Sequence, residues 1–225
     1  MGKFKQFKTF IRKKIGMVGV AEFVDDAVEA NTDKNWNKWF SDPKYLKEYA
    51  DEGRLKSYDE VITIFENSGA FSNKKSMLDA GCGTGHLLAA MARRFSDIKL
   101  YGADFSDEGL AVSKKTAPSA EFFHLDLYNL PDSYQQYDIV LCSEVLEHLL
   151  YPDTALENLK KLVAPNGILL LTVPNGRIDR YGGHINFWSP ESWKIFVEKY
   201  CSSFGKISTG VFHNNLNNFA IISKL

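Results

Sequence analysis

One stretch of this sequence decides the fold: Ser76-Met-Leu-Asp-Ala-Gly-Cys-Gly-Thr-Gly-His-Leu-Leu88. Met77, Leu78 and Ala80 form a short apolar run that leads into three alternate glycines, and apolar residues then recur at helical spacing. This pattern predicts a strand, a tight turn and a helix. Glycines reach backbone angles that are closed to other residues, and they let a ligand approach the main-chain N–H groups at the start of the helix. The turn therefore predicts a site for a nucleotide-like ligand.

The spacing of the glycines separates the known uses of such a turn. A phosphate-binding loop would continue with Gly-Lys-Ser or Gly-Lys-Thr, and neither tripeptide occurs in the sequence. A dinucleotide-binding turn reads G-x-G-x-x-G, whereas Gly81, Gly83 and Gly85 are evenly spaced and follow an acid, Asp79. This favours an adenosine ligand without a pyrophosphate over NAD. A tight turn that binds nothing is the remaining alternative.

The composition is that of an ordinary globular protein with no bias toward a polyanion. Hydrophobic residues make up 44% of the 225 residues, and the net charge of −1 offers no general attraction for nucleic acid or a membrane. Three widely spaced cysteines, an odd number without metal-ligand spacing, favour a reducing compartment. The sequence shows neither a secretory signal nor a membrane span. We therefore expect a cytoplasmic protein.

The first 55 residues are expected to form an extension ahead of a main domain over residues 56–225. Residues 3–15 alternate apolar and basic side chains at helical spacing, which predicts a basic amphipathic helix. Such a helix can lie on an anionic membrane, or pack on its own domain or on a second subunit. The aromatic residues Trp36, Trp39 and Tyr45 are candidates for a lid that faces a flat ligand, and packing of helices on the sheet is the alternative.

Strand and helix patterns alternate after residue 76. Strands are expected over 98–103, 120–124, 137–142 and 168–173, with helices over 107–115 and 153–162. A further helix starts at Ser189, and two strands near the C-terminus are joined by an asparagine-rich turn. The pattern predicts an α/β fold, a Rossmann-like, mostly parallel seven-stranded sheet with helices on both faces and a C-terminal antiparallel hairpin.

Acidic residues follow the second and third of these strands. Ligands of parallel sheets sit beyond the carboxyl ends of the strands, so these positions are candidates for ligand binding. Asp104 can accept both hydroxyls of a ribose, and Asp126 can accept a hydrogen bond from an adenine amino group. Phe105 and Leu127 are available to sandwich the adenine ring. Each acid alone could instead cap a helix or a turn.

The fourth strand is followed by a group of metal-type ligands. If the segment after Ser143 turns helically, Glu144, Glu147 and His148 share one face. His184, after the fifth strand, could add another ligand. Oxygen ligands with a neutral imidazole suit Mg²⁺ or Mn²⁺. The alternative is that both glutamates are solvated helix charges and that His148 bonds to nearby backbone.

Taken together, these motifs resemble the class I S-adenosylmethionine-dependent methyltransferases over about residues 56–225. The stretch Asp79 to Gly85 is similar to the family's cofactor loop almost letter for letter. By resemblance, the amino acid part of S-adenosylmethionine lies against the backbone from Gly81 through Cys82 to Gly85. Asp104 and Asp126 then occupy the ribose and adenine positions, and Ser143 begins the loop below the methyl group.

Within that family, Glu144 to His148 resembles the Glu-x-x-Glu-His segment of the ubiquinone-biosynthesis O-methyltransferases and the small-RNA 2′-O-methyltransferases. Those enzymes hold a divalent metal there, and the RNA enzymes complete the site with a further histidine after the fifth strand. This chain has a single histidine in that region, His184. The Glu-His pattern also occurs in relatives that are not known to need a metal.

The sequence therefore predicts a methyltransferase that acts on a hydroxyl of a small molecule or sugar. A hydroxyl must lose its proton, either through a divalent metal, Mg²⁺ or Mn²⁺, or through a neutral histidine, His148 or His184 acting as the catalytic base. An RNA 2′-O-methyltransferase is the second enzymatic reading, against which the near-zero net charge speaks. A third alternative is a protein that binds the cofactor and interacts with a partner but does not catalyse a reaction.

Overall fold

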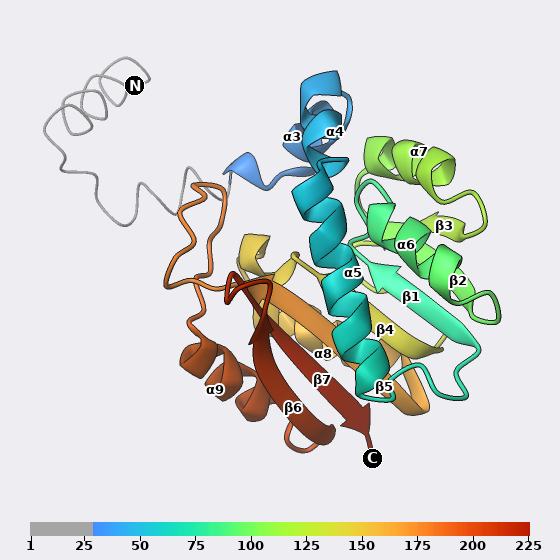
Figure 1. The fold of residues 1–225 in the computed structure, drawn as a ribbon, viewed down its shortest axis with the longest axis vertical. Helices are drawn as coiled ribbons and strands as arrows, with labels where there is room; N and C mark the ends of the chain where they lie inside the picture. The colour runs from blue at the N-terminus through green and yellow to red at the C-terminus, as the bar shows by residue number, and fades with distance from the viewer. Residues whose placement is uncertain (1–28) are drawn as a thin grey trace, which may run out of the picture.

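The computed structural model describes residues 29–225, which form an α/β fold around one seven-stranded sheet (Figure 1). This is the predicted fold class. The strands are β1 (Ser76–Ala80), β2 (Lys99–Asp104), β3 (Glu121–His124), β4 (Tyr137–Ser143), β5 (Val163–Pro174), β6 (Gly205–Phe212) and β7 (Asn217–Lys224). The helices are α3 (Asp33–Phe40), α4 (Pro43–Tyr49), α5 (Glu52–Asn67), α6 (His86–Arg94), α7 (Asp107–Thr116), the short 3₁₀ turn η1 (Leu146–His148), α8 (Pro152–Leu162) and α9 (Pro190–Cys201).

The strand order fixes where a ligand can bind. The sheet runs β3-β2-β1-β4-β5-β7-β6, with parallel pairs up to β5 and antiparallel pairs in the C-terminal hairpin. From β1 the chain first adds strands on one side and then, with β4, on the other. The direction of growth therefore reverses between β1 and β4, and ligands of such sheets bind at the carboxyl ends of the strands at that point. Both the glycine turn and the Glu-His segment follow these two strands.

Helices cover both faces because the central strands are apolar on both sides. Met77 of β1 belongs to a buried cluster with α5 and α6, while its neighbour Leu78 belongs to a second cluster with α8 and α9. Successive side chains of a strand point to opposite faces, so one strand serves both layers. Full burial of such a side chain contributes about 1.5–3 kcal/mol. The sheet is therefore a rigid base on which the loops at its carboxyl end are held.

The glycine turn has the geometry that its sequence predicts. Gly81, Gly83 and Gly85 all have positive φ angles, of 87°, 49° and 76°. A Cβ atom on Gly81 would lie 2.4 Å from a methyl carbon of Val145, in the loop after β4. A side chain there would therefore disrupt both the turn and its packing on the neighbouring loop.

Two local features differ from the prediction. Strand β5 begins at Val163, five residues earlier than expected, and it contains an irregularity at Asn166, whose φ angle is 58°. The pairing of β4 with β5 shifts register at the same place. The segment after β4 is the second difference: η1 starts only at Leu146, so the helical turn does not include Glu144.

The predicted amphipathic helix over residues 3–15 lies outside the described residues, and the domain boundary at residue 55 stays a prediction. Helices α3 and α4 lie above the carboxyl end of the sheet, where α3 packs on α7 (Figure 1). None of the helices within residues 29–225 is both long and apolar enough to span a membrane.

Candidate active site

A cavity of about 630 Å³ lies at the carboxyl ends of β1 and β4. Nearly all of the predicted cofactor-binding residues line it: Asp79, Gly81, Cys82, Gly83, Asp104, Phe105, Asp126, Leu127 and Ser143. Gly85 does not. Its φ of 76° and the 2.9 Å that would separate its Cβ from Cα of Ser113 show that it is needed for the close packing of α6 on α7. Gly85 therefore has a structural role in this packing, and its contact with a ligand stays a prediction.

Two buried carboxylates face this cavity from β1 and β2. Asp104 accepts hydrogen bonds from the backbone N–H groups of Gly83 and Ser106, both at 2.9 Å, so it ties the glycine turn to the end of β2. Burial, and then the negative charge of Asp104, raise the pKa of Asp79 to about 7. Two acids in one buried wall favour a ligand that carries positive charge, because such a ligand offsets their mutual repulsion.

The third predicted acid lies further along the same wall. Asp126 accepts one hydrogen bond from the backbone N–H of Tyr128 at 2.8 Å and one from the Asn129 side chain at 2.7 Å. These bonds hold the carboxylate at the turn after β3, next to the buried side chains of Leu125 and Leu127. Each carboxylate oxygen keeps a lone pair beyond the one already used. The geometry is compatible with the predicted contact to an adenine amino group.

Arg54 is a cavity residue that the sequence reasoning missed. It is the only lysine or arginine among the described residues that line this cavity. Its guanidinium lies 4.6 Å from the ring centroid of Tyr49. Arg54 itself lies one helical turn before Tyr58 on α5. A cation held over an aromatic ring is oriented as well as stabilised. The helical pattern of residues 52–67 holds two basic residues, Arg54 and Lys56, and it does not show which of them faces the cavity.

Aromatic side chains of α3 and α4 close the top of the cavity. Trp36 and Tyr45 line it, and their role as a lid stays a prediction. Trp39 does not line it: its ring stacks on Tyr45 at 5.6 Å and meets Trp36 edge-on at 5.0 Å. Phe40, one helical turn after Trp36, takes the place that Trp39 was expected to occupy. Residues four apart share a helix face, whereas Trp39 is rotated toward its neighbours.

Three of the four predicted metal-type ligands meet at one end of the cavity. Glu147, His148 and His184 each offer a ligand atom, and these atoms lie within 4.8 Å of one another. The rings of the two histidines are 4.6 Å apart and nearly perpendicular, and Trp36 packs edge-on against His148. We refer to these three residues as the histidine cluster.

Backbone hydrogen bonds bring the two halves of the cluster together. The carbonyl oxygen of Glu147 accepts from the N–H groups of Ile185 at 2.7 Å and Asn186 at 3.0 Å. The Asn186 side chain also donates to the carbonyl of Leu149 at 2.7 Å. Residues 185 and 186 of the loop after β5 are thus attached to η1 and to the residue that follows it. His184 is held against His148 although 35 residues separate them in sequence.

His148 is held neutral with a defined tautomer. Its Nδ1 lies 3.3 Å from the carbonyl oxygen of Gly183. A carbonyl only accepts, so Nδ1 carries the proton and Nε2 keeps a lone pair. Burial, and then the neighbouring His184, lower the pKa of His148 to about 3. A neutral imidazole with a free lone pair can ligate a metal or accept a proton.

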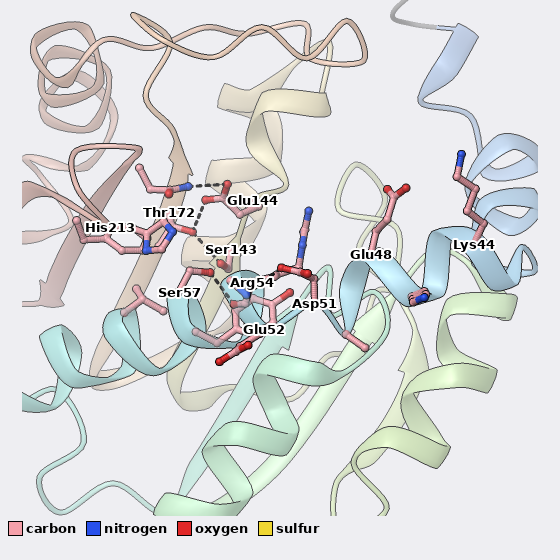
Figure 2. A pocket seen from close by; sticks show the side chains of 17 residues that line it. Lys44, Glu48, Asp51, Glu52, Arg54, Ser57, Ser143, Glu144, Thr172 and His213 are labelled. Carbon is pink, nitrogen blue, oxygen red and sulfur yellow. Dashed lines mark hydrogen bonds between the residues drawn. The ribbon is translucent and has the colours of Figure 1, made fainter.

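Glu144 is absent from the cluster, which corrects the prediction that it shares a helical face with Glu147 and His148. Its backbone has a positive φ of 56°, which turns the side chain away from that face. The carboxylate instead accepts hydrogen bonds from Thr172 and Asn217, both at 2.9 Å (Figure 2). A positive φ in a residue that is neither glycine nor asparagine is uncommon and is kept only where the surroundings enforce it.

Glu147 provides the test of whether a cation fits the cluster. Its side chain is 1% exposed, and neither carboxylate oxygen has a hydrogen-bond partner among the described residues. Burial, and then the charge of Glu144, raise its pKa. A buried carboxylate without a partner is costly, and a bound cation removes that cost. One carboxylate and two imidazoles also form a donor set that divalent metals accept.

A second cavity, of about 980 Å³, lies between α5, the ends of β4 and β5, and the turn between β6 and β7 (Figure 2). The two cavities share five lining residues and meet between the end of β4 and helices α4 and α5: Glu48, Arg54, Tyr58, Ser143 and Glu144. Hydroxyl groups and charges of both signs line the second cavity. It therefore suits a polar molecule that approaches the first cavity from the side of β5.

Comparison with known proteins agrees with this architecture. A family model described as a methyltransferase domain matches residues 30–203. The ubiquinone biosynthesis O-methyltransferase of Acinetobacter baylyi is 32% identical over 118 residues, which cover 50% of this chain and 48% of that protein. The corresponding protein of Aliivibrio fischeri is 28% identical over 158 residues, 62% of this chain and 66% of that protein. The match to the first relative thus spans about half of that protein's length.

Solved structures share the fold at low sequence identity. The plantazolicin methyltransferase BpumL, solved with S-adenosylhomocysteine, has a TM-score of 0.67 and 15% identity, covering 90% of this chain and 99% of that one. The N-methyltransferase NodS of Bradyrhizobium japonicum, solved with the same ligand, has a TM-score of 0.67 and 15% identity, covering 86% and 98%. Since the family model matches well over half of the sequence, this chain belongs to the methyltransferase domain family, among the class I S-adenosylmethionine-dependent methyltransferases.

Proposed function

We propose that this protein transfers a methyl group from S-adenosylmethionine to a hydroxyl of a small molecule that carries two neighbouring oxygens, such as a catechol, a vicinal diol or a sugar. The observation that carries the proposal is the histidine cluster, in which Glu147, His148 and His184 converge at one end of the cofactor cavity. Amines and carbanions need no such cluster in order to accept a methyl group, whereas a hydroxyl has to lose its proton.

The cluster would hold a divalent metal, Mg²⁺ or Mn²⁺, through Glu147, His148 and His184. Such an ion, when bound, lowers the pKa of an acceptor hydroxyl that coordinates it. The surrounding residues keep the cluster dry, because Trp36 packs on His148 and Tyr181 lies beside both histidines. Exclusion of water strengthens the electrostatic interactions inside the site. Without a metal, the neutral His148 is the base to be expected.

The other residues of the first cavity have complementary roles toward the donor. Asp79 and Asp104 face the cavity with buried carboxylates, which suits the sulfonium and ammonium charges of S-adenosylmethionine. Arg54, as the single lysine or arginine in the described wall, is our choice for the donor's carboxylate. The glycine turn offers backbone N–H groups beside them. We place the body of the acceptor in the second cavity, next to Ser143 and Glu144.

The proposal can be tested with the purified protein, labelled S-adenosylmethionine and a panel of acceptors. Catechols, vicinal diols and sugars are each compared with the matching compound that has a single hydroxyl, with Mg²⁺ or Mn²⁺ and with a chelator. We expect methylation of the two-oxygen acceptors only, and loss of activity in chelator. Transfer to single hydroxyls that survives chelation would rule out the metal and leave a histidine base. Methylation of a 3′-terminal ribose alone would favour the RNA enzyme.

Asp79 gives cofactor binding a dependence on pH. Its pKa of about 7 lies well above the usual value, so the free protein protonates it below neutral pH. A cationic ligand binds better once this carboxylate is ionised, and affinity for S-adenosylmethionine should therefore rise about tenfold between about pH 6 and pH 8. The Asp79→Asn variant should bind more weakly without this rise. Calorimetry measures the affinity of both proteins at each pH. Any titration of the ligand itself affects both proteins equally and cancels when their affinities are compared.

The same raised pKa predicts the opposite trend for the stability of the ligand-free protein. A group that is more basic in the folded state adds stability at low pH and loses it as pH rises through its folded pKa. Wild type should therefore lose thermal stability relative to Asp79→Asn as the pH rises from about 4, the usual pKa of an aspartate, to about 7, and the difference should level off above that. Equal pH profiles of the two proteins, for both affinity and melting temperature, would show that Asp79 does not titrate in this range.

A further inference from the structure

Asp179 is a partly buried acid beside the histidine cluster. It lies in the loop after β5, and its side chain is 9% exposed. Its Oδ2 is 2.5 Å from Nδ1 of His184, and its Oδ1 accepts a hydrogen bond from the backbone N–H of Tyr181 at 3.0 Å. Each carboxylate oxygen is therefore committed to a different donor.

We infer that Asp179 is a positioning residue that fixes the tautomer and orientation of His184. An ionised carboxylate only accepts hydrogen bonds, so Nδ1 of His184 carries the proton and Nε2 keeps the lone pair. His148 reaches the same tautomer through the carbonyl of Gly183. Both histidines thus present Nε2 as the nitrogen that can ligate or accept a proton. The value of this arrangement for metal binding rests on the proposed function.

The loop that carries Asp179 is built to keep it in place. Asn175 is 5% exposed, and its carbonyl accepts from the N–H groups of Ile178 and Asp179, both at 3.0 Å. The Asn175 side chain donates to the carbonyl of Asn215 at 2.9 Å, which fastens the loop to the turn between β6 and β7. The carboxylate of Asp179 is therefore presented to His184 from a fixed backbone and cannot easily move away.

Replacement of Asp179 by asparagine keeps the shape of the side chain but removes its negative charge and should change the tautomer of His184. The N–H of Tyr181 still requires an acceptor, so the amide oxygen of Asp179→Asn takes the place of Oδ1. The amide NH₂ group then faces Nδ1 of His184. An NH₂ group only donates, so Nδ1 must become the acceptor, and the ring proton moves to Nε2. The substitution thus removes the lone pair from the nitrogen that the cluster needs.

The test is the nitrogen NMR spectrum of the histidine rings in the full-length, metal-free protein. We expect the Nδ1–H tautomer of His184 in wild type and the Nε2–H tautomer in Asp179→Asn. Calorimetric titration with Mn²⁺ should then show an affinity about 10 to 100 times lower for the variant. Glu60→Gln is the matched control, because Glu60 bonds Nδ1 of His213 at 2.9 Å. It should change the spectrum of His213 and leave His184 unchanged.

The outcomes separate this inference from the proposed function. If His184 carries its proton on Nε2 in wild type, or keeps the Nδ1–H tautomer in Asp179→Asn, the role of Asp179 is wrong. The wild-type spectrum decides this even if the variant does not fold. If the tautomer switches as expected but wild type does not bind Mn²⁺, the role of Asp179 is supported, and it is the metal in the proposed function that fails.

Discussion

Glu147→Gln is expected to lower methyl transfer at least about 100-fold and to remove Mn²⁺ binding, because the amide takes the only carboxylate out of the histidine cluster. The shape of the side chain is conserved, and neither carboxylate oxygen has a hydrogen-bond partner among the described residues that the change would break. Loss of folding is therefore not expected. The melting temperature of the metal-free variant should stay close to that of wild type, because the raised pKa of Glu147 favours the neutral acid and the amide has nearly the same shape. Activity with saturating Mg²⁺ or Mn²⁺, together with melting temperatures, measures both effects.

Glu144→Gln is the informative comparison, because the two glutamates are adjacent in the motif but differ in their surroundings. The carboxylate of Glu144 accepts from Thr172 and Asn217 and is absent from the cluster. We expect this variant to retain Mn²⁺ affinity within a few fold and to change the Michaelis constant of the acceptor. Equal loss of Mn²⁺ binding in both variants would mean that Glu144 rotates into the cluster when the ion binds. Full activity of Glu147→Gln would rule out the proposal that methyl transfer needs a metal in the histidine cluster.

The contrast between these two glutamates shows what the sequence could predict. The glycine turn and the alternation of strands and helices were predictable from local patterns. Positive φ angles favour glycine, and burial requires apolar residues at the spacing of a strand or a helix. The position of Glu144 was not. A helical turn from Glu144 to His148 is the simplest reading of the motif, but the chain turns through a left-handed residue first. That conformation depends on contacts with Thr172 and Asn217, which lie far away in sequence.

The missed residues have a similar physical explanation. Arg54 and Asp179 belong to segments on opposite sides of the glycine turn in sequence, and only the folded chain brings them to one site. Asp179 follows β5 by five residues, so attention to polar residues after strand ends could have found it. Nothing in the sequence marks its hydrogen bond to His184. Pairing between distant loops is set by tertiary contacts such as those of Glu147 with Ile185.

Asp104→Ala should weaken S-adenosylhomocysteine binding by about 2 to 3 kcal/mol, since charge-assisted hydrogen bonds to ribose hydroxyls are lost. The structure adds a second cause. Both oxygens of Asp104 already accept backbone N–H groups, from Gly83 and Ser106, and the substitution also releases the glycine turn. Asparagine is no safer replacement, because its NH₂ group would face one of these two N–H donors. Both variants should therefore bind poorly, and the melting temperature reports how far the turn loosens.

A ligand lacking one ribose hydroxyl distinguishes the two causes. If Asp104 binds the ribose, wild type should discriminate against 2′-deoxy-S-adenosylhomocysteine, and Asp104→Ala should bind both ligands equally weakly. If Asp104 only holds the glycine turn, the variant should weaken both ligands and keep whatever preference wild type shows. The two changes are the removal of the ribose hydroxyl and the Asp104→Ala substitution. Calorimetry gives the free energy by which their combined effect differs from the sum of the two, and this difference isolates the contact with the ribose. A preference that is unchanged by the substitution would remove Asp104 from the ribose site, while its bonds to Gly83 and Ser106 would still account for the weaker binding.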